Sequence, residues 1–428
     1  MGAARPETAG KSNPEIVWLL ERIFGFGHWR FAVLFTLFFF SPYWLVINLI
    51  EVLSWHPPGL VTKDGINIGR DFVAFYSAAS LTMNGEAASA YDHVAIHAAQ
   101  GEAIGATVKF FPWFYPPTML MFIAPLALAH YFVALAIWCV APLVSLMIVV
   151  KRYVGHAWAA AAVLLFPGTV HSLLTGQNGV LSALIIAAGV LNLERRPVLA
   201  GAILGALSYK PHVAAAVYAA LLIGRYWHAL AASIAVALAL ALLSVGLFGT
   251  EPWVAFLRET HVAKTFLEGG QLPWEFMATI FGTARLAGLD SNVAYALQAA
   301  VTCGALVSLF IVWRRRDIPL EQRAAVLVTV IPLVTPYAFS YDLAVIVIAL
   351  VWLARTGFET GFPRDELIVF ALAWVVPPMG WILADSTGVL LTPVVLVALL
   401  AVLLRRILGD ARTSGLPEQA AQRALASS

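Results

Sequence analysis

The chain has 428 residues, of which 61% are hydrophobic and only 12% are Asp, Glu, Lys or Arg, about half the charged share of a typical soluble domain. A mean hydropathy of +0.84 and repeated apolar runs of bilayer length exclude an ordinary soluble fold. The net charge of +2 gives no reason to expect a nucleic acid partner, and Cys139 and Cys303 lie in apolar runs that predict neither a disulfide nor a zinc site. The sequence predicts an all-α polytopic membrane protein.

The two ends of the chain differ from the middle. Residues 1–30 contain four cations and precede an apolar run, 31–50, that is too long for the core of a cleaved signal peptide. We expect 1–30 to be a cytoplasmic segment and 31–50 to be a retained first span. A transmembrane domain over 31–404 is then followed by a polar tail, 405–428, which is rich in Ala, Arg and Gln and is expected to be flexible and cytoplasmic.

Two polar stretches interrupt the apolar sequence and are expected as outer loops. The first, 51–115, holds nine charged residues, and the second covers 250–290. The remaining pattern predicts about twelve transmembrane helices. Their expected ranges are 31–50, 116–129, 131–150, 157–175, 179–193, 198–223, 229–248, 291–313, 323–337, 341–354, 367–384 and 387–404.

Lys and Arg concentrate in cytoplasmic loops of membrane proteins, so the charges test this arrangement. With a cytoplasmic N-terminus, most clusters fall on the cytoplasmic side and both large loops fall outside, together with the turn 336–342. Lys151–Arg152 and Glu194–Arg196 disagree, because the same count puts them outside. Two explanations stay open: a re-entrant run, for which 198–223 is the best candidate, or an exception to the rule.

Ionisable residues at membrane depth cost several kcal/mol on insertion scales unless a cavity or partner receives them, so each is a candidate site residue. Lys210 lies in Ser-Tyr-Lys-Pro-His, where Pro211 also frees backbone carbonyl groups. Asp342 follows Tyr341 at a span end and fits either a helix N-terminal carboxylate or a site residue. Asp385 fits a solvated turn.

The first outer loop contains the motif Gly-Arg-Asp-Phe-Val-Ala-Phe-Tyr at residues 69–76. Asp71 opens a stretch with helical apolar spacing, so helix capping alone explains an Asp there as well as a functional role does. An aromatic and Pro-rich segment containing Tyr115 leads into the next apolar run. Further on, Gln177 and Asn178 lie between two glycines and are also typical of bonds between neighbouring helices.

Taken in order, these features resemble glycosyltransferase family 87. The resemblance rests on Asp-Phe-x-x-Phe-Tyr in a large loop after the first span, Tyr-Pro-Pro opening the next run, Pro-Leu-Ala-Leu, Gly-Gln-Asn, Lys-Pro and a late Tyr-Asp turn, and it covers roughly residues 31–355. It implies the GT-C fold and transfer of a sugar, mannose in the best-known members, from a polyprenyl phosphate donor to a hydroxyl group of a lipid or glycan acceptor. The expected location is the outer face of the cytoplasmic membrane.

The resemblance also implies roles for individual residues. Asp71 matches the carboxylate taken as general base, and such activation of a hydroxyl group is typically worth about 10²- to 10⁴-fold. Family members often carry a His in the late turn, where this chain has Tyr337, Tyr341 and Asp342, so the phosphate-side partner stays open. Candidates for donor phosphate binding are Arg70, Lys210, His212 and His261; candidates for sugar or acceptor binding are Tyr76, Tyr115, Gln177, Asn178, Trp274, Glu275, Tyr341 and Asp342.

Which phosphate candidate is favoured depends on where the Lys210 run opens. An outward opening favours Lys210, then Arg70 and His212, whereas an inward end favours Arg70 and His261. The sequence demands no cofactor. The sequence leaves open whether a divalent cation binds. The outer-loop carboxylates Asp64, Asp71, Asp92 and Glu275 could hold one, but their spacing is not that of a metal-ligand motif. A single displacement without a covalent intermediate inverts the anomeric centre.

The main alternative is a transporter or flippase for a lipid or small solute. Secondary transporters usually show repeated halves and broken helices at the membrane midplane, whereas here the polar residues gather in outer loops and no repeat is visible. A ligase or polymerase of lipid-linked oligosaccharides fits less well, because its large loop comes later in the chain. A structural scaffold gives no reason to keep Arg70, Asp71 and Lys210.

Overall fold

The computed structural model describes residues 65–414 together with 40–43, 45–46, 49–50, 53–56 and 60–62; within these, the side chains of 55, 56, 378, 385, 386 and 410–414 are not described. The expected cytoplasmic segment 1–30, most of the first span, Asp64 and the tail beyond 414 therefore lie outside the described residues. Asp385 belongs by its backbone to the last turn of a helix, and its side chain is among those not described.

The described chain is nearly all helical, which confirms the predicted class. Its elements, in chain order, are β1 (Trp55–His56), β2 (Val61–Thr62), α3 (Phe72–Met83), η1 (Ala87–Tyr91), α4 (His93–Ile104), α5 (Pro117–Ile123), η2 (Ala124–Leu128), α6 (Tyr131–Val154), α7 (Ala157–Leu165), α8 (Pro167–Leu174), α9 (Gly179–Asn192), α10 (Pro197–Gly205), η3 (Ala206–Tyr209), α11 (Pro211–Ile223), α12 (Trp227–Phe248), α13 (Glu251–Gly269), η4 (Trp274–Phe276), α14 (Ile280–Leu286), α15 (Ser291–Trp313), α16 (Leu320–Leu333), η5 (Ser340–Ile346), α17 (Val347–Thr360), α18 (Arg364–Thr387) and α19 (Thr392–Ser414). The two strands form one short antiparallel pair.

Several helices begin where the sequence places a residue suited to a helix start. Pro117, Pro167, Pro197 and Pro211 each occupy the first position of a helix, where the missing N–H costs no hydrogen bond. The prolines therefore divide the apolar runs into separate helices. At Pro167 the division bends the chain by 52° between α7 and α8.

Five of the described helices are long and apolar enough to cross a membrane, and the bent α7–α8 pair makes a sixth candidate. The five are α6, α12, α15, the combined η5–α17 and the first 18 residues of α19. The predicted count of about twelve is thus not confirmed, partly because α9, α10, α11 and the α5–η2 pair are apolar but short.

The run 116–129 does not cross the membrane domain, contrary to the prediction. It enters beside Tyr115, whose hydroxyl group donates to Gln177, and leaves at Ala129, whose carbonyl accepts from the Tyr76 hydroxyl at 3.0 Å. Helix α3 packs against both α5 and η2. Both ends of the run therefore lie beside the first loop, and the short α5 and η2 helices turn back instead of spanning.

The run 198–223 also returns to the end where it starts. The buried Arg323 guanidinium donates to Glu194, just before α10, at 2.6 Å and to the Tyr226 hydroxyl, just after α11, at 2.8 Å. Residues 197–223 therefore form a hairpin of α10, η3 and α11 with Lys210 at its tip. This supports the re-entrant explanation of the charge disagreement.

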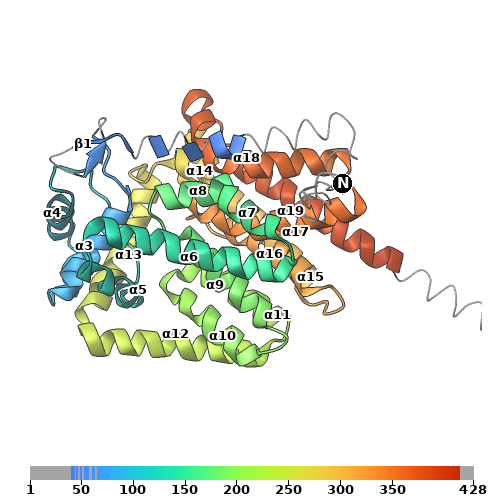
Figure 1. Ribbon diagram of the computed structural model, residues 1–428, viewed down its shortest axis with the longest axis horizontal. Coiled ribbons are helices and arrows are strands. Elements are labelled where there is room, and N and C mark those ends of the chain that lie inside the picture. Colours follow the sequence, from blue (N-terminus) through green and yellow to red (C-terminus); the bar gives the residue numbers. More distant parts are fainter. Residues whose placement is uncertain are drawn as a thin grey trace, which may run out of the picture.

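With both runs corrected, the cationic clusters gather at one end of the molecule, which we call the cationic end. The Tyr153 hydroxyl donates to Glu321 at 2.8 Å, Arg316 donates to the Gly224 carbonyl at 2.9 Å, and Arg406 pairs with Glu366. The end is defined by Lys151, Arg152, Arg195, Arg196, Arg225, Arg314, Arg315, Arg316, Arg355, Arg364, Arg405 and Arg406. Long helices such as α6 and α12 run from it to the opposite end, which carries α3 and α4 (Figure 1).

The loop 51–115 is folded against the membrane domain. Helix α3 packs against α4, η1 and α5, and its Phe75 ring lies within 5.4 Å of the rings of Trp113, Tyr115 and Trp138, centroid to centroid. The aromatic segment before α5 therefore holds α3 against α6. This packing fixes the position of the residues that begin α3, including Asp71.

Candidate active site

Asp71 stands at the start of α3, in a strained turn. Gly69 and Arg70 both have positive φ, +78° and +41°, which is rare for a residue with a side chain. The turn is held by the Asn67 side-chain amide, which donates to the Arg70 carbonyl at 2.7 Å, and by the Asp71 N–H, which donates to Thr175 at 3.1 Å. The Asp71 carboxylate makes no capping bond to α3, so capping does not explain this residue.

The Asp71 carboxylate instead bonds across the fold. Its Oδ2 accepts from the Gln177 side-chain amide at 2.7 Å. Burial raises the pKa of Asp71 to about 6, against the opposing effects of the Gln177 bond and of the Arg70 and Lys109 cations. The carboxylate thus changes charge close to neutral pH, where a general base is most effective. Lys109 is a residue that the sequence interpretation missed.

Gln177 lies in a four-residue turn, Gly176–Gly179, between α8 and α9. A Cβ atom at Gly176, whose φ is +62°, would lie 2.5 Å from the Phe72 Cβ and 2.6 Å from the Gly69 carbonyl oxygen. A Cβ atom at Gly179 would lie 2.0 Å from the Tyr341 carbonyl oxygen. The two glycines therefore let this turn touch the Asp71 turn on one side and η5 on the other.

The far side of the Gly176–Gly179 turn carries a buried ion pair. The Lys210 ammonium donates to the Asn178 side-chain oxygen at 2.7 Å and pairs with Asp342, whose other oxygen accepts from the Phe339 N–H at 3.0 Å. Lys210 is 3% exposed, so the pair lies in a medium where an unpaired charge is costly. Asp342 thus lies in the first turn of η5, in agreement with its interpretation as a helix N-terminal carboxylate, and it is also the ion-pair partner of Lys210.

These contacts form one connected set, which we call the site network: Asp71, Gln177, Asn178, Lys210 and Asp342. Tyr115 joins it through its hydroxyl group, which donates to Gln177 Oε1 at 3.1 Å. The Tyr341 ring centroid lies 5.7 Å from the Lys210 Nζ. The structure thus brings together seven of the thirteen candidates named from the sequence. Arg70, which precedes Asp71, is not counted among the seven.

A small cavity lies beside the Lys210–Asp342 pair. His212 lines it together with Ser182 and Thr335, and the His212 ring lies 6.0 Å from the Tyr337 ring, centroid to centroid. Among the described residues, His212 Nε2 and Asn178 Nδ2 are buried without a hydrogen-bond partner. Buried polar atoms of this kind usually receive a partner such as water or a ligand.

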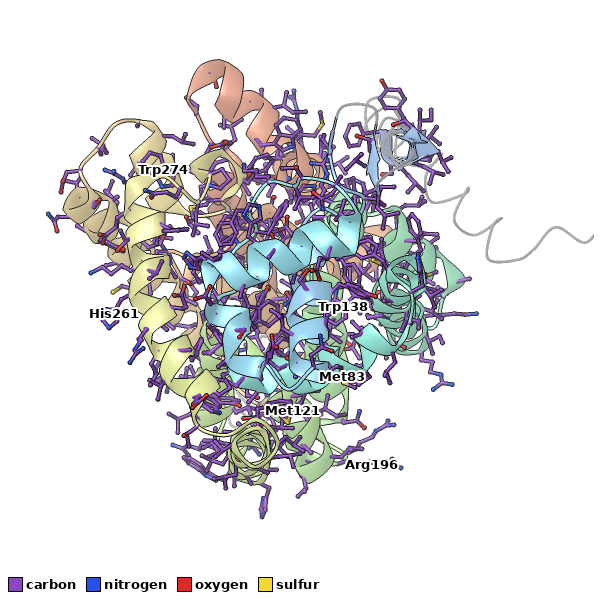
Figure 2. The ribbon with its side chains drawn as sticks, turned by 90° about the vertical axis from the view of Figure 1, so that its left-hand side faces the viewer. Met83, Met121, Trp138, Arg196, His261 and Trp274 are labelled. Atoms are coloured by element: carbon purple, nitrogen blue, oxygen red, sulfur yellow. The ribbon has the colours of Figure 1, made fainter. Side chains whose placement is uncertain are left out.

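The other sequence candidates lie outside the site network. The Tyr76 hydroxyl group donates a hydrogen bond to the Ala129 carbonyl. His261 is exposed on α13, where Figure 2 shows its side chain projecting away from the body of the molecule. Trp274 donates through Nε1 to the Leu267 carbonyl at 2.7 Å and is covered by Arg285.

Glu275 follows Trp274 in η4, and the backbone of this segment reaches the late turn. The Ala278 N–H donates to the Ala338 carbonyl at 2.9 Å, and Met277 and Phe339 form an isolated bridge. The second loop therefore lies next to η5, although among the described residues the side chains of Trp274 and Glu275 make no hydrogen bond or ion pair with the site network. Their part in substrate binding stays a prediction.

The structure offers no ready metal site within the part of the chain that it describes. No group of three or more His, Cys, Asp or Glu side chains is close enough there to hold a metal ion. Asp92, one of the carboxylates considered, caps α4 by accepting from the N–H groups of Val94 and Ala95, both at 2.9 Å. Dependence on a divalent cation therefore stays open.

Fold and site together define a polytopic helical membrane protein in which the buried Asp71 carboxylate lies among polar side chains from several helices. A family model, glycosyltransferase family 87, matches residues 113–336, slightly more than half of the chain. The chain therefore belongs to glycosyltransferase family 87 and is a membrane glycosyltransferase. The matched range includes Gln177, Asn178 and Lys210, whereas Asp71 and Asp342 lie outside it. Searches among curated proteins and among solved structures gave no match.

Proposed function

We propose that this protein transfers a sugar from a polyprenyl phosphate donor to a hydroxyl group of a lipid or glycan acceptor, with Asp71 as general base. The observation that carries the proposal is the Asp71 carboxylate, with its pKa raised to about 6 by burial and its position fixed by Gln177. Mannose as the donor sugar rests on the family resemblance. Family membership favours transfer over the transporter alternative.

The proposed reaction is a single displacement. The acceptor oxygen forms a bond to the anomeric carbon while the bond from that carbon to the phosphate oxygen breaks, and the acceptor proton passes to Asp71. Polyprenyl phosphate leaves with the bonding electron pair. Because attack and departure occur on opposite faces of the sugar, a β-linked donor gives an α-linked product.

The departing phosphate needs positive charge or oriented donors. Arg70 and Lys109 both act electrostatically on the Asp71 carboxylate, which supports them as the cations nearest the reacting atoms. Lys210 is held by Asp342 and Asn178, so we assign it to positioning the Gly176–Gly179 turn. His212 lines the cavity beside Lys210, and His261 is exposed on α13. The proposal therefore assigns neither histidine to phosphate binding.

The charge distribution supports an outer active site. All of the clusters that define the cationic end lie opposite to α3 and α4, and Lys and Arg favour the cytoplasmic side. We therefore propose that the cationic end faces the cytoplasm and that Asp71 faces the outer side of the cytoplasmic membrane. The acceptor then meets the donor at the outer membrane surface.

Substitution of the proposed base is the first test of this function. Purified protein in lipid vesicles is supplied with polyprenyl phosphate mannose and a panel of lipid and glycan acceptors, and products are identified by mass spectrometry. Asp71→Asn should reduce turnover by about 10²- to 10⁴-fold, since Asn keeps the size of the side chain but cannot take the proton.

Asp317→Asn, which removes an exposed carboxylate at the cationic end, serves as the matched control and should keep full turnover. Thermal unfolding should show that neither variant is less stable than the wild type, so that a loss of turnover is not a loss of folding. Wild-type turnover by Asp71→Asn would remove Asp71 as the base, and the absence of any product from the wild type with all donors would reject the proposed donor class.

A further inference from the structure

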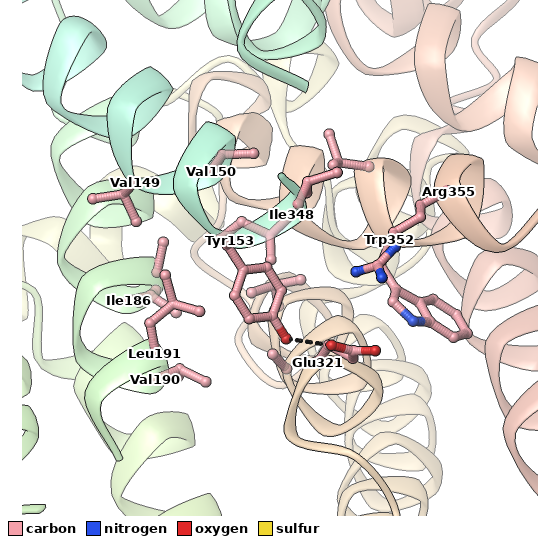
Figure 3. A pocket seen from close by; sticks show the side chains of 15 residues that line it. Val149, Val150, Tyr153, Ile186, Val190, Leu191, Glu321, Ile348, Trp352 and Arg355 are labelled. Atoms are coloured by element: carbon pink, nitrogen blue, oxygen red, sulfur yellow. Dashed lines mark hydrogen bonds between the residues drawn. The ribbon is translucent and has the colours of Figure 1, made fainter. Parts of the chain in front are cut away.

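A second cavity lies at the cationic end, away from the site network. It is enclosed by α6, α9, α16 and α17, and Figure 3 shows the side chains that line it. Of the 15 lining residues, only Tyr153, Glu321 and Arg355 are polar. No part of the proposed reaction uses this cavity.

The polar groups of this cavity lie at its outer end and the apolar ones extend inward. Tyr153 is in the last turn of α6 and Glu321 is in the first turn of α16, where the Tyr153 hydroxyl donates to Glu321. Along α16 the apolar wall continues to Val328, a distance of about 10 Å at the rise of an α-helix. Such a cavity matches a molecule with a polar head and a narrow apolar tail.

Four cations near the outer end of the cavity, which we call the cationic rim, indicate which polar headgroup the cavity accepts. Lys151 and Arg152 lie in the last turn of α6, and Arg195 and Arg196 follow the end of α9. All four are exposed, and they lie at the ends of helices that enclose the cavity rather than among the residues that line it. None of the four has an ion pair with a carboxylate among the described residues.

The carboxylates around the same rim are already engaged. Glu321 accepts from Tyr153, Glu359 pairs with Arg355 at 3.2 Å, and Glu194 pairs with Arg323 at 2.6 Å. The rim therefore has an excess of positive charge. A peptide is a poor occupant, because its backbone groups would lose their hydrogen bonds against the apolar walls.

We propose that this cavity binds an anionic phospholipid, with one acyl chain between α6, α9, α16 and α17 and the phosphate at the cationic rim. Basic pockets between transmembrane helices on the cytoplasmic side are suited to such headgroups. The inner end reaches Ile186, which also lines the cavity beside Lys210 and Asp342. The bound chain thus supports the helix α9 that leads from the Gly176–Gly179 turn.

Lipid binding to the purified full-length protein tests the proposal without using enzyme activity. The detergent-solubilised protein is titrated with phosphatidylglycerol or phosphatidylcholine of the same chain length, and adducts are counted by native mass spectrometry. Phosphatidylglycerol should bind more tightly, and Arg152→Gln should weaken it by about fivefold, the effect of one cation near a membrane surface, while phosphatidylcholine binding changes little. Equal binding of the two lipids would overturn the proposal.

Filling the apolar wall tests the acyl chain separately. Ala324→Phe and the milder Ala187→Leu place atoms in the cavity and should abolish the phosphatidylglycerol preference. Arg258→Gln on exposed α13 and Ala239→Phe on the exposed face of α12 are matched controls at other places and should leave it unchanged. Full phosphatidylglycerol binding by both filled variants would reject the cavity as the binding site. If both filled variants fail to fold, unchanged phosphatidylglycerol binding by Arg152→Gln would reject the proposal instead.

Discussion

Asp71 and Asp342 are two carboxylates of one network with different partners. Asp342 faces the Lys210 ammonium and a backbone N–H, whereas Asp71 faces the neutral amide of Gln177. The ion pair gives the buried Asp342 carboxylate a cationic partner, while burial raises the pKa of Asp71. Different surroundings thus separate a structural carboxylate from one that is able to exchange a proton.

The pH dependence of turnover should report the Asp71 carboxylate. With a pKa of about 6, activity should be low below pH 5 and rise to a plateau above pH 7. Gln177→Ala removes the hydrogen bond that holds this pKa down, so the midpoint should move to higher pH. The measurement is kcat/KM for transfer between pH 5 and 9; an unchanged midpoint in Gln177→Ala would mean that the bond does not act on the base.

The same pKa has a consequence for stability. Because the pKa of Asp71 is raised in the folded protein, its stabilising contribution is present below the ordinary value of 3.8 and is lost as the pH rises through about 6. Asp71→Asn removes this loss and should be at least as stable as the wild type above pH 7.

The Lys210–Asp342 pair should behave as a unit. Lys210→Met or Asp342→Asn alone leaves a buried charge without its partner, which typically costs about 3–5 kcal/mol of stability. The double variant should lose much less than the two single losses combined. Thermal unfolding of the three variants in detergent measures this coupling, and strictly additive losses would show that the two charges do not depend on each other.

At the scale of elements, the Gly176–Gly179 turn is the joint between the two halves of the site network. It touches the Asp71 turn through Gly176 and η5 through Gly179, while α8 and α9 on either side supply its fixed ends. Asp71 and Lys210 come from opposite flanks of this joint, one from the start of α3 and one from the tip of the α10–α11 hairpin. Their relative position therefore depends on how closely three backbones approach.

Gly179→Ala should separate these elements. The added Cβ would lie 2.0 Å from the Tyr341 carbonyl oxygen, so α9 or η5 must move and the Gln177 bond to Asp71 should be disturbed. We expect at least a tenfold loss of turnover, on the order of the effect of a 1 Å misplacement of catalytic groups, with helical content unchanged by circular dichroism.

Gly246→Ala in α12 is the matched control, because a Cβ there meets nothing within 4 Å. It should keep full turnover and gain a little stability from helix propensity. If Gly179→Ala and Gly246→Ala had the same turnover, the close contact with η5 would have no bearing on the site.

At the scale of the whole molecule, the proposed orientation depends on the runs 116–129 and 198–223, which fold back. With both counted as spans, two cationic clusters fall on the wrong side, and with both folded back every cluster of the cationic end falls on one side. The positive-inside tendency then applies without exception to the described clusters. The opposite end carries the first loop, α13 and the site network.

Labelling of single cysteines tests this orientation. In a background with Cys139→Ala and Cys303→Ala, Glu102→Cys on α4 and Arg195→Cys after α9 introduce thiols at exposed positions of opposite ends. A membrane-impermeant thiol reagent should label Glu102→Cys in intact cells and Arg195→Cys only after permeabilisation. The reverse pattern would place the active site in the cytoplasm.

Part of the candidate site could be predicted from the sequence. Lys210, Asp342, Gln177 and Asn178 are polar residues in apolar runs, where a polar group needs a partner or a cavity. Asp71, Tyr115 and Tyr341 follow from the motifs of the family resemblance. The sequence also points to Tyr76, His261 and Trp274, which lie outside the site network. Residue type shows that a polar group needs a partner, but it does not show which one.

The sequence by itself determined the helical membrane class, the family resemblance and the two polar loops, because these follow from composition, local hydropathy and short motifs. Only the tertiary structure decided that Lys210 pairs with Asp342, 132 residues away, and that two apolar runs fold back. Hydropathy measures how readily a segment leaves water, and it is the same whether lipid or protein surrounds that segment. The partner of a buried charge depends on packing between distant segments, which no local pattern records.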